Sequence, residues 1–102
     1  MREPVLLATL VTTRACLNTK LRRYPEAVEL WVHAAELWNA CEPERGGVDW
    51  TEAQIMAGRM ALELGDRSEA SACFLHVLQS TPECNPDREL AAKLLKSLQS
   101  VG

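Results

Sequence analysis

The sequence predicts a single all-α domain. Alanine and leucine dominate the 102 residues, and no runs of valine, isoleucine or threonine occur. Apolar residues recur with the i, i+3, i+4 spacing of helices, and no segment shows the strict alternation of a half-buried strand. With 47% hydrophobic and 25% charged residues, the chain has the composition of a globular protein and not of a disordered one.

The first two helices are expected at about 3–21 and from Pro25, directly after Tyr24, to about Cys41. Pro25 fits the first position of the second helix, because its missing N–H would have no partner there. The apolar residues that follow it keep the helical rhythm. The run EPERGG, Glu42–Gly47, should end this helix through its proline and glycine pair.

Capping residues place the third and fourth helices. Asp49 and Thr51 each precede a Glu or Gln by three residues, so either can start a helix that ends at Gly65. Asp66 can then cap the fourth helix, with Glu69 reaching back toward it. Both helices therefore begin at residues whose side chains can accept hydrogen bonds from the free backbone N–H groups of the first turn, and the third ends at a glycine that can reverse the chain.

A fifth helix is expected from about 85 to 99. Asn85 is a suitable N-cap and Pro86 a suitable first residue. The helix has one narrow apolar seam and a polar back, formed by Leu90, Leu94 and Leu98 against Arg88, Lys93 and Lys96.

Charge and cysteine content exclude some functions. A net charge of −3 and a pI near 5.3 give no basic footprint for nucleic acid or anionic membranes. No apolar run approaches the roughly 18 residues of a membrane span, and the N-terminal VLLATLV lacks the pattern of a signal peptide. We therefore expect a cytoplasmic protein whose four cysteines are free and mostly buried thiols.

One stretch has the spacing of a known repeat. Gly58, Gly65, Ala70, Phe74 and Pro82 are separated by seven, five, four and eight residues. Residues 51–84 resemble the tetratricopeptide repeat, a 34-residue helix–turn–helix unit. The resemblance implies that small residues let two helices approach, a Gly-Asp turn reverses the chain, an aromatic residue fills the gap and a proline ends the unit.

The pattern partly recurs 43 residues upstream, over about residues 8–41. Ala15, Ala27 and Trp31 correspond to Gly58, Ala70 and Phe74, whereas Arg22 stands in place of the turn glycine. The resemblance implies a first unit with a long second helix, a loop at 42–50, a second repeat at 51–84 and a capping helix at 85–99. An unrelated helical bundle is the alternative, because YPEAVELWVHAAELW also resembles a microtubule-interacting-and-trafficking three-helix hairpin.

Catalytic or metal chemistry has weak support. Cys73 and His76 are three residues apart on a helix, but no paired ligand spacing accompanies them and Cys73 lies in the apolar stripe. Gly46-Gly47 lacks the context of a phosphate loop. We expect no metal, no cofactor and no enzymatic activity. Trp38 and Trp50 flank the 42–50 loop and are expected to hold it against the helices, the alternative being an exposed anchor for a partner.

The resemblance implies a concave face lined by the first helix of each pair, where a peptide or helix of a partner protein docks. The positions carried over to this face are Thr12, Cys16, Lys20, Glu52, Ile55, Met56, Arg59, Leu62 and Lys93. They lack the basic, asparagine-bearing clamp with which some family members bind acidic tails, and their mixed character suits an amphipathic helix or short peptide. We therefore expect a protein-binding adaptor or assembly subunit.

A second hypothesis concerns the apolar N-terminal helix. Two repeats and a cap are fewer than the three or so units that usually make a stable array. Val5, Leu6, Leu7 and Leu10 are unusually apolar for an end helix. The alternative function is a small helical subunit that forms homo-oligomers through this helix, without a peptide groove.

Overall fold

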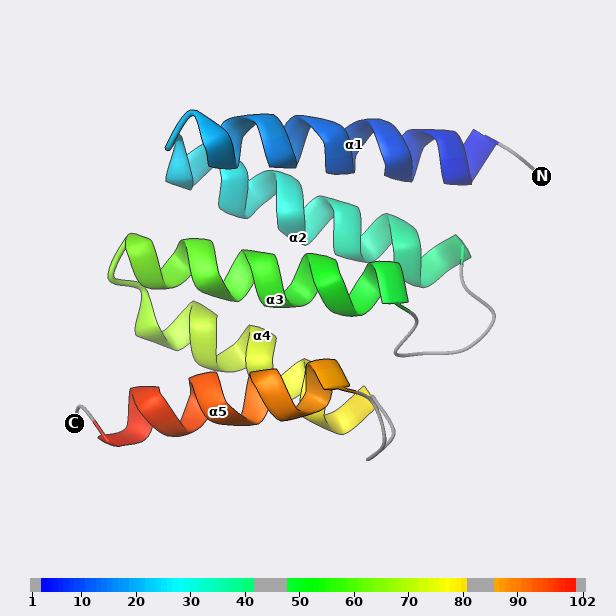
Figure 1. Cartoon of the computed structure of the whole chain (residues 1–102). Helices are drawn as coiled ribbons and strands as arrows, with labels where there is room; N and C mark the ends of the chain where they lie inside the picture. Colours follow the sequence, from blue (N-terminus) through cyan, green and yellow to red (C-terminus); the bar gives the residue numbers. More distant parts are fainter. Residues whose placement is uncertain (1–2, 42–47, 81–85, 101–102) are drawn as a thin grey trace.

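The computed structural model describes residues 3–41, 48–80 and 86–100, and these form five α-helices without a strand among them. The all-α prediction is confirmed (Figure 1). The helices are α1 (Glu3–Lys20), α2 (Tyr24–Cys41), α3 (Val48–Glu63), α4 (Arg67–Ser80) and α5 (Pro86–Ser100).

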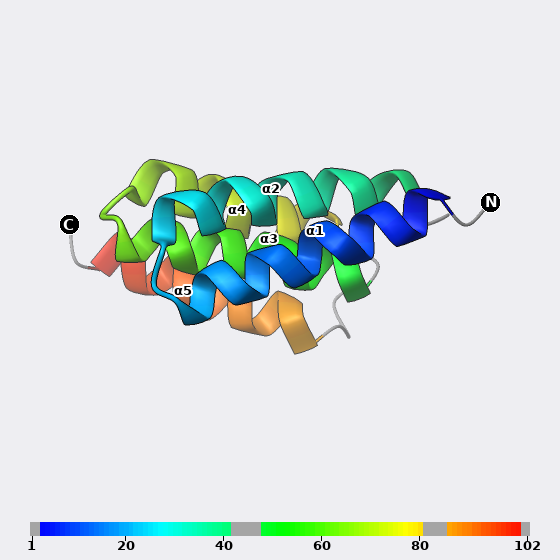
Figure 2. The same cartoon turned by 90° about the horizontal axis from the view of Figure 1, so that it is seen from above.

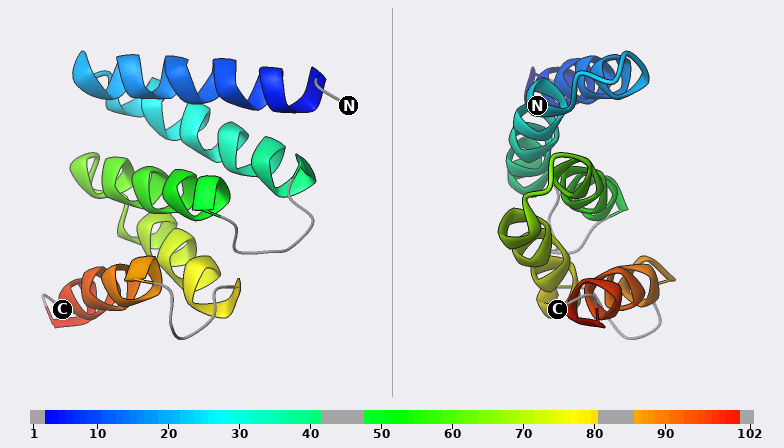
Figure 3. Two further views of the ribbon diagram at one scale, coloured as in Figure 1. Left: turned by 45° about the vertical axis from the view of Figure 1, so that its right-hand side comes forward. Right: turned by 90° about the vertical axis from the view of Figure 1, so that its left-hand side faces the viewer.

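Each helix packs antiparallel against the next one in the chain, so that the five form a flat, curved array of 45 × 33 × 17 Å (Figure 1). Seen from above, α2 and α4 lie along one side and α1, α3 and α5 along the other (Figure 2). The end-on view shows a crescent, with α1 and α5 at its two tips (Figure 3). The odd-numbered helices therefore line its concave face, and α3 also contacts α5.

The two tight turns use the left-handed backbone region. Gly65, between α3 and α4, has φ +80°, a conformation that glycine adopts without steric cost. Arg22, between α1 and α2, has φ +60°, although a residue with a Cβ adopts this region at a cost. The arginine thus takes the backbone conformation of the glycine it replaces in the predicted pattern, so the two turns have the same geometry with different strain.

The cap predicted for α4 is present, whereas α3 begins earlier than predicted and α2 begins at Tyr24, one residue before Pro25. The Oδ1 atom of Asp66 accepts a hydrogen bond of 3.0 Å from the Glu69 backbone N–H, which confirms the N-cap of α4. Helix α3 begins at Val48, so residues 48–50, which we assigned to the loop at 42–50, form its first turn. Trp50 is consequently buried, 8% exposed, and is not an exposed anchor. Residues 42–47 and Asn85 lie outside the described residues.

Alanines and tryptophans build the first half of the core. Helices α1, α2 and α3 meet through side chains as small as alanine, which allows close helix approach. Trp31, 1% exposed, and Trp50 fill the remaining space. The buried alanines of this cluster are Ala15, Ala27, Ala34, Ala35, Ala53 and Ala57.

The second half of the core joins α3, α4 and α5 around Phe74, which is fully buried. Its ring lies against Gly58: a Cβ placed on Gly58 would be 2.5 Å from Cε1 and 2.8 Å from Cζ of Phe74. A side chain on Gly58 would therefore overlap the ring. The close approach that the spacing predicts at Gly58, Ala70 and Phe74 is present in the structure.

Candidate functional site

A first hollow, which we call the N-terminal hollow, lies between the first halves of α3 and α5. It has a volume of about 390 Å³. Apolar side chains meet charged ones around it, since Ile55 and Met56 stand beside Arg59 on α3 and Leu90 projects from α5. Its lining residues are Glu52, Ile55, Met56, Arg59, Asp87 and Leu90.

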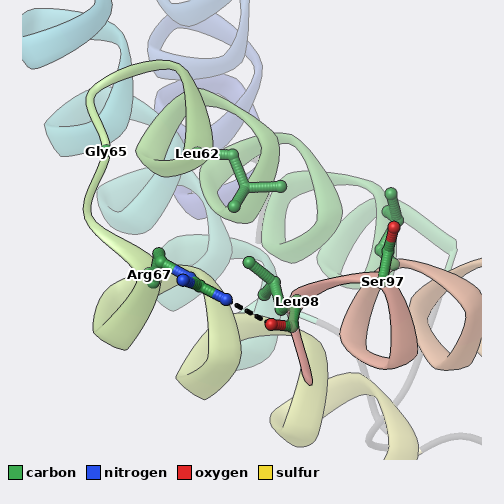
Figure 4. A pocket seen from close by; sticks show the side chains of 6 residues that line it. Leu62, Gly65, Arg67, Ser97 and Leu98 are labelled. Carbon is green, nitrogen blue, oxygen red and sulfur yellow. Dashed lines mark hydrogen bonds between the residues drawn. The ribbon is translucent and has the colours of Figure 1, made fainter. Parts of the chain in front are cut away.

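A second hollow, the C-terminal hollow, lies between the last turns of the same helices and has a volume of about 370 Å³. Half of its lining residues are leucines, Leu62 on α3 and Leu94 and Leu98 on α5, and the others are Gly65, Arg67 and Ser97. The Arg67 guanidinium donates a hydrogen bond to the Leu98 backbone oxygen (Figure 4). This contact ties the start of α4 to the end of α5 beside the hollow.

The two hollows share one line along α3 and α5. Ile55 and Leu62 are seven residues apart on α3, which corresponds to about 10 Å of helix rise. The carboxylates of Glu52 and Asp87 belong to the N-terminal hollow, whereas Arg59 and Arg67 lie farther along. The line therefore runs over an apolar floor from an acidic end, at Glu52 and Asp87, past Arg59 to Arg67 at the opposite end.

Five of the nine predicted site residues line these hollows. Glu52, Ile55, Met56 and Arg59 come together in the N-terminal hollow, and Leu62 lies in the C-terminal one. Arg59 and Glu52 are exposed, while Ile55 is only 4% exposed and forms the floor. The positions expected on α3 are thus brought together by one helix face.

The three predicted residues on α1 line neither hollow. Cys16 and Lys20 are exposed on α1. The Thr12 hydroxyl is used inside the protein: it donates to the Ala8 carbonyl oxygen at 2.8 Å and accepts from Trp38 Nε1 at 2.9 Å. Its one hydrogen is therefore already committed, and Thr12 anchors an indole of α2.

Thr19, seven residues or about two turns further along α1, makes the same pair of hydrogen bonds as Thr12. Its Oγ1 donates to the Ala15 carbonyl oxygen at 2.8 Å and accepts from Trp31 Nε1 at 2.9 Å. Both tryptophan N–H groups of α2 are thus satisfied by threonines of α1, as buried indoles require. Nothing in the spacing of a single helix identifies these pairs, because they join residues on two helices.

On α5 the site uses other residues than we expected. Lys93 pairs with Glu89 at 3.7 Å, and both side chains are about three-quarters exposed on the outer face (side-chain exposure 73% and 75%). The hollows are lined instead by Leu90, Leu94 and Leu98. These leucines belong to the apolar seam that the sequence predicts on this helix. Leu90 is 39% exposed, so this part of the seam is left partly uncovered.

Cys73 is held as a neutral thiol. Burial, followed by the nearby charge of Glu69, raises the pKa of the Cys73 thiol to about 12. The Sγ atom donates to Glu69 Oε1 at 3.9 Å. His76 is exposed whereas Cys73 is buried, so the two side chains do not share an environment. Cys41 is half-buried and Cys16 exposed, so of the three described cysteines, all of them free, only Cys73 is buried.

Some features are absent from the part of the chain that the structure describes. No cluster of three or more His, Cys, Asp or Glu side chains in it is arranged to hold a metal ion. None of the described helices has the length and apolar character that crossing a membrane requires. No family model, curated protein sequence or solved structure matches the chain.

Proposed function

We propose that the chain is a non-enzymatic, tetratricopeptide-like docking module of the cytoplasm, an adaptor or assembly subunit that binds an amphipathic helix of a partner protein along α3 and α5. The observation that carries this proposal is the pair of hollows that lie on one line along α3 and α5. The Gly58–Phe74 contact and the antiparallel helix pairs support the repeat-like architecture.

The spacing of the hollows fits a helical ligand. Two positions seven residues apart on a helix lie on one face and are separated by about 10 Å, the same separation as Ile55 and Leu62. A partner helix with large apolar residues at i and i+7 would therefore place one in each hollow. We expect a basic residue of the partner near Glu52 and Asp87 and an acidic one near Arg59.

A selection from a library of amphipathic peptides tests this function. Peptides enriched on the wild-type protein are measured against Leu90→Glu and Leu75→Glu by fluorescence anisotropy. The two leucines are similarly exposed, 39% and 43%, but only Leu90 borders a hollow. We expect at least a tenfold loss of affinity for Leu90→Glu, about 1.4 kcal/mol, and no change for Leu75→Glu. Peptides that bind both variants like the wild type would contradict the proposal.

A further inference from the structure

Helix α1 is apolar on both sides, and the larger side chains point outward. Ala8 and Ala15 face α2 and are fully buried. Leu6, Leu10 and Leu17 are 59%, 62% and 55% exposed. With 100° per residue these leucines lie on the side of α1 opposite the buried alanines. A surface helix normally turns its leucines to the core, so α1 has the pattern of a helix with partners on two sides.

The two end helices of the crescent, α1 and α5, differ in the polarity of their outer faces. Helix α5 presents Glu89, Lys93 and Lys96 to solvent on the side away from α4, the polar face expected of a capping helix. No described residue covers the outer leucines of α1. A head-to-tail stack of two molecules would place these leucines on the charged face of α5. Contact of α1 with the α1 of a second copy matches leucine with leucine instead.

The spacing of the outer leucines is nearly symmetric along the helix. Leu21, which is 52% exposed, continues the row of Leu6, Leu10 and Leu17, and we call these four residues the leucine stripe. The Leu21 backbone N–H donates to the Leu17 oxygen at 3.0 Å, so Leu21 continues the helical hydrogen-bond pattern. If two α1 helices pair antiparallel with the twofold axis between Thr13 and Arg14, Leu10 lies opposite Leu17 of the second copy. Leu6 then lies opposite Leu21. Such self-complementarity is what a twofold interface requires.

We propose that this chain forms a twofold homodimer by antiparallel pairing of α1 through Leu6, Leu10, Leu17 and Leu21. The proposal does not depend on the function of the α3–α5 hollows, which lie on other helices. The proposed interface consists of one pair of α1 helices, each 18 residues and about 27 Å long. A single helix pair buries less area than a standard interface, which buries about 800 Å² per partner. We therefore expect a dissociation constant on the order of micromolar.

Analytical ultracentrifugation from about 1 to 100 µM tests the surface. The wild type should change from monomer to dimer across this range. Leu10→Glu should weaken the dimer by at least about a hundredfold, because it buries two carboxylates, while its circular dichroism stays helical since Leu10 is exposed. Leu75→Glu on α4 is the matched control and should leave the dimer unchanged. A wild-type monomer at 100 µM, or a dimer that Leu10→Glu leaves intact, overturns the proposal. A monomer would mean that the outer leucines of α1 bind a different protein and not a second copy of this chain.

Arg14 tests the antiparallel arrangement itself. It is exposed beside the stripe, and the proposed axis brings the Arg14 side chains of both copies close together on one side. Mixing wild type with Arg14→Glu should then give a heterodimer about tenfold tighter than either homodimer, because opposite charges replace like ones. Native mass spectrometry of the mixture measures this. A statistical mixture of dimers would show that the two Arg14 residues do not face each other.

Discussion

The contact between Gly58 and Phe74 yields the sharpest stability prediction. In an exposed helical position, Gly→Ala stabilises a helix by about 0.8–1 kcal/mol. Gly58 is in the middle of α3, yet its Cβ position is within 3.1 Å of three atoms of the Phe74 ring. Because Phe74 is fully buried in a packed core, the ring has little space in which to move.

The magnitude follows from two opposing effects. Overpacking a core by one methyl group typically costs about 1–3 kcal/mol, and the gain in helix propensity offsets part of it. We expect Gly58→Ala to destabilise the protein by about 1–2 kcal/mol. In a chain of this size each kcal/mol corresponds to a decrease of about 4–8 °C in melting temperature.

Urea denaturation followed by circular dichroism measures this free energy. Phe74→Leu alone should cost about 1–2 kcal/mol through the space it leaves. In the double variant the added methyl group occupies that space, so the two losses should fall short of additive by about 1 kcal/mol. Simple additivity, or a stabilised Gly58→Ala variant, would refute the close approach of α3 and α4 that the fold requires.

Three further variants test local features. Arg22→Gly should stabilise the protein by about 0.5–1 kcal/mol and Gly65→Ala should destabilise it by about 1 kcal/mol, both in urea unfolding, because both positions have positive φ. Thr12→Val should cost about 1–2 kcal/mol by leaving an indole N–H unpaired, whereas Thr13→Val, whose hydroxyl bonds only to a helix carbonyl, should cost less than 0.5 kcal/mol by the same assay. The raised pKa of Cys73 means that the folded state holds this proton more tightly than the unfolded state. The contribution of this thiol to the free energy of unfolding is therefore fully present below about pH 9 and is lost as the pH rises to about 12. Cys73→Ala should reduce this alkaline loss in urea titrations at pH 8 and pH 10, and equal losses in both proteins would contradict the assignment.

The sequence was informative wherever one residue has one physical role. Gly65 at a turn and Asp66 as a cap each follow from local chemistry, and both are found where predicted. Pro25 is the second residue of α2 and not the first, because the helix already begins at Tyr24. Contacts between helices were harder to predict. Trp38 and Thr12 are 26 residues apart, and their hydrogen bond depends on how α1 and α2 are aligned.

The candidate site shows the same division. The α3 residues of the groove share one helix face, so their periodicity alone places Ile55, Arg59 and Leu62 together. The contribution of α5 depends on its rotation about its own axis. We assigned Lys93 to the concave wall, but Leu90 and Leu94 line the hollows, because the Lys93 side of α5 faces solvent. A single sequence does not determine that rotation.

Docking along α3 and α5 is tested most directly by a ¹H–¹⁵N NMR titration of the wild type with a selected peptide. We predict that chemical-shift changes concentrate at Glu52–Leu62 on α3 and Asp87–Leu98 on α5, the residues of the two hollows. The amides of Val28–Glu36 on α2, on the other side of the array, should not move. Changes concentrated on α2, or spread evenly over all five helices, would contradict the assignment of the docking surface.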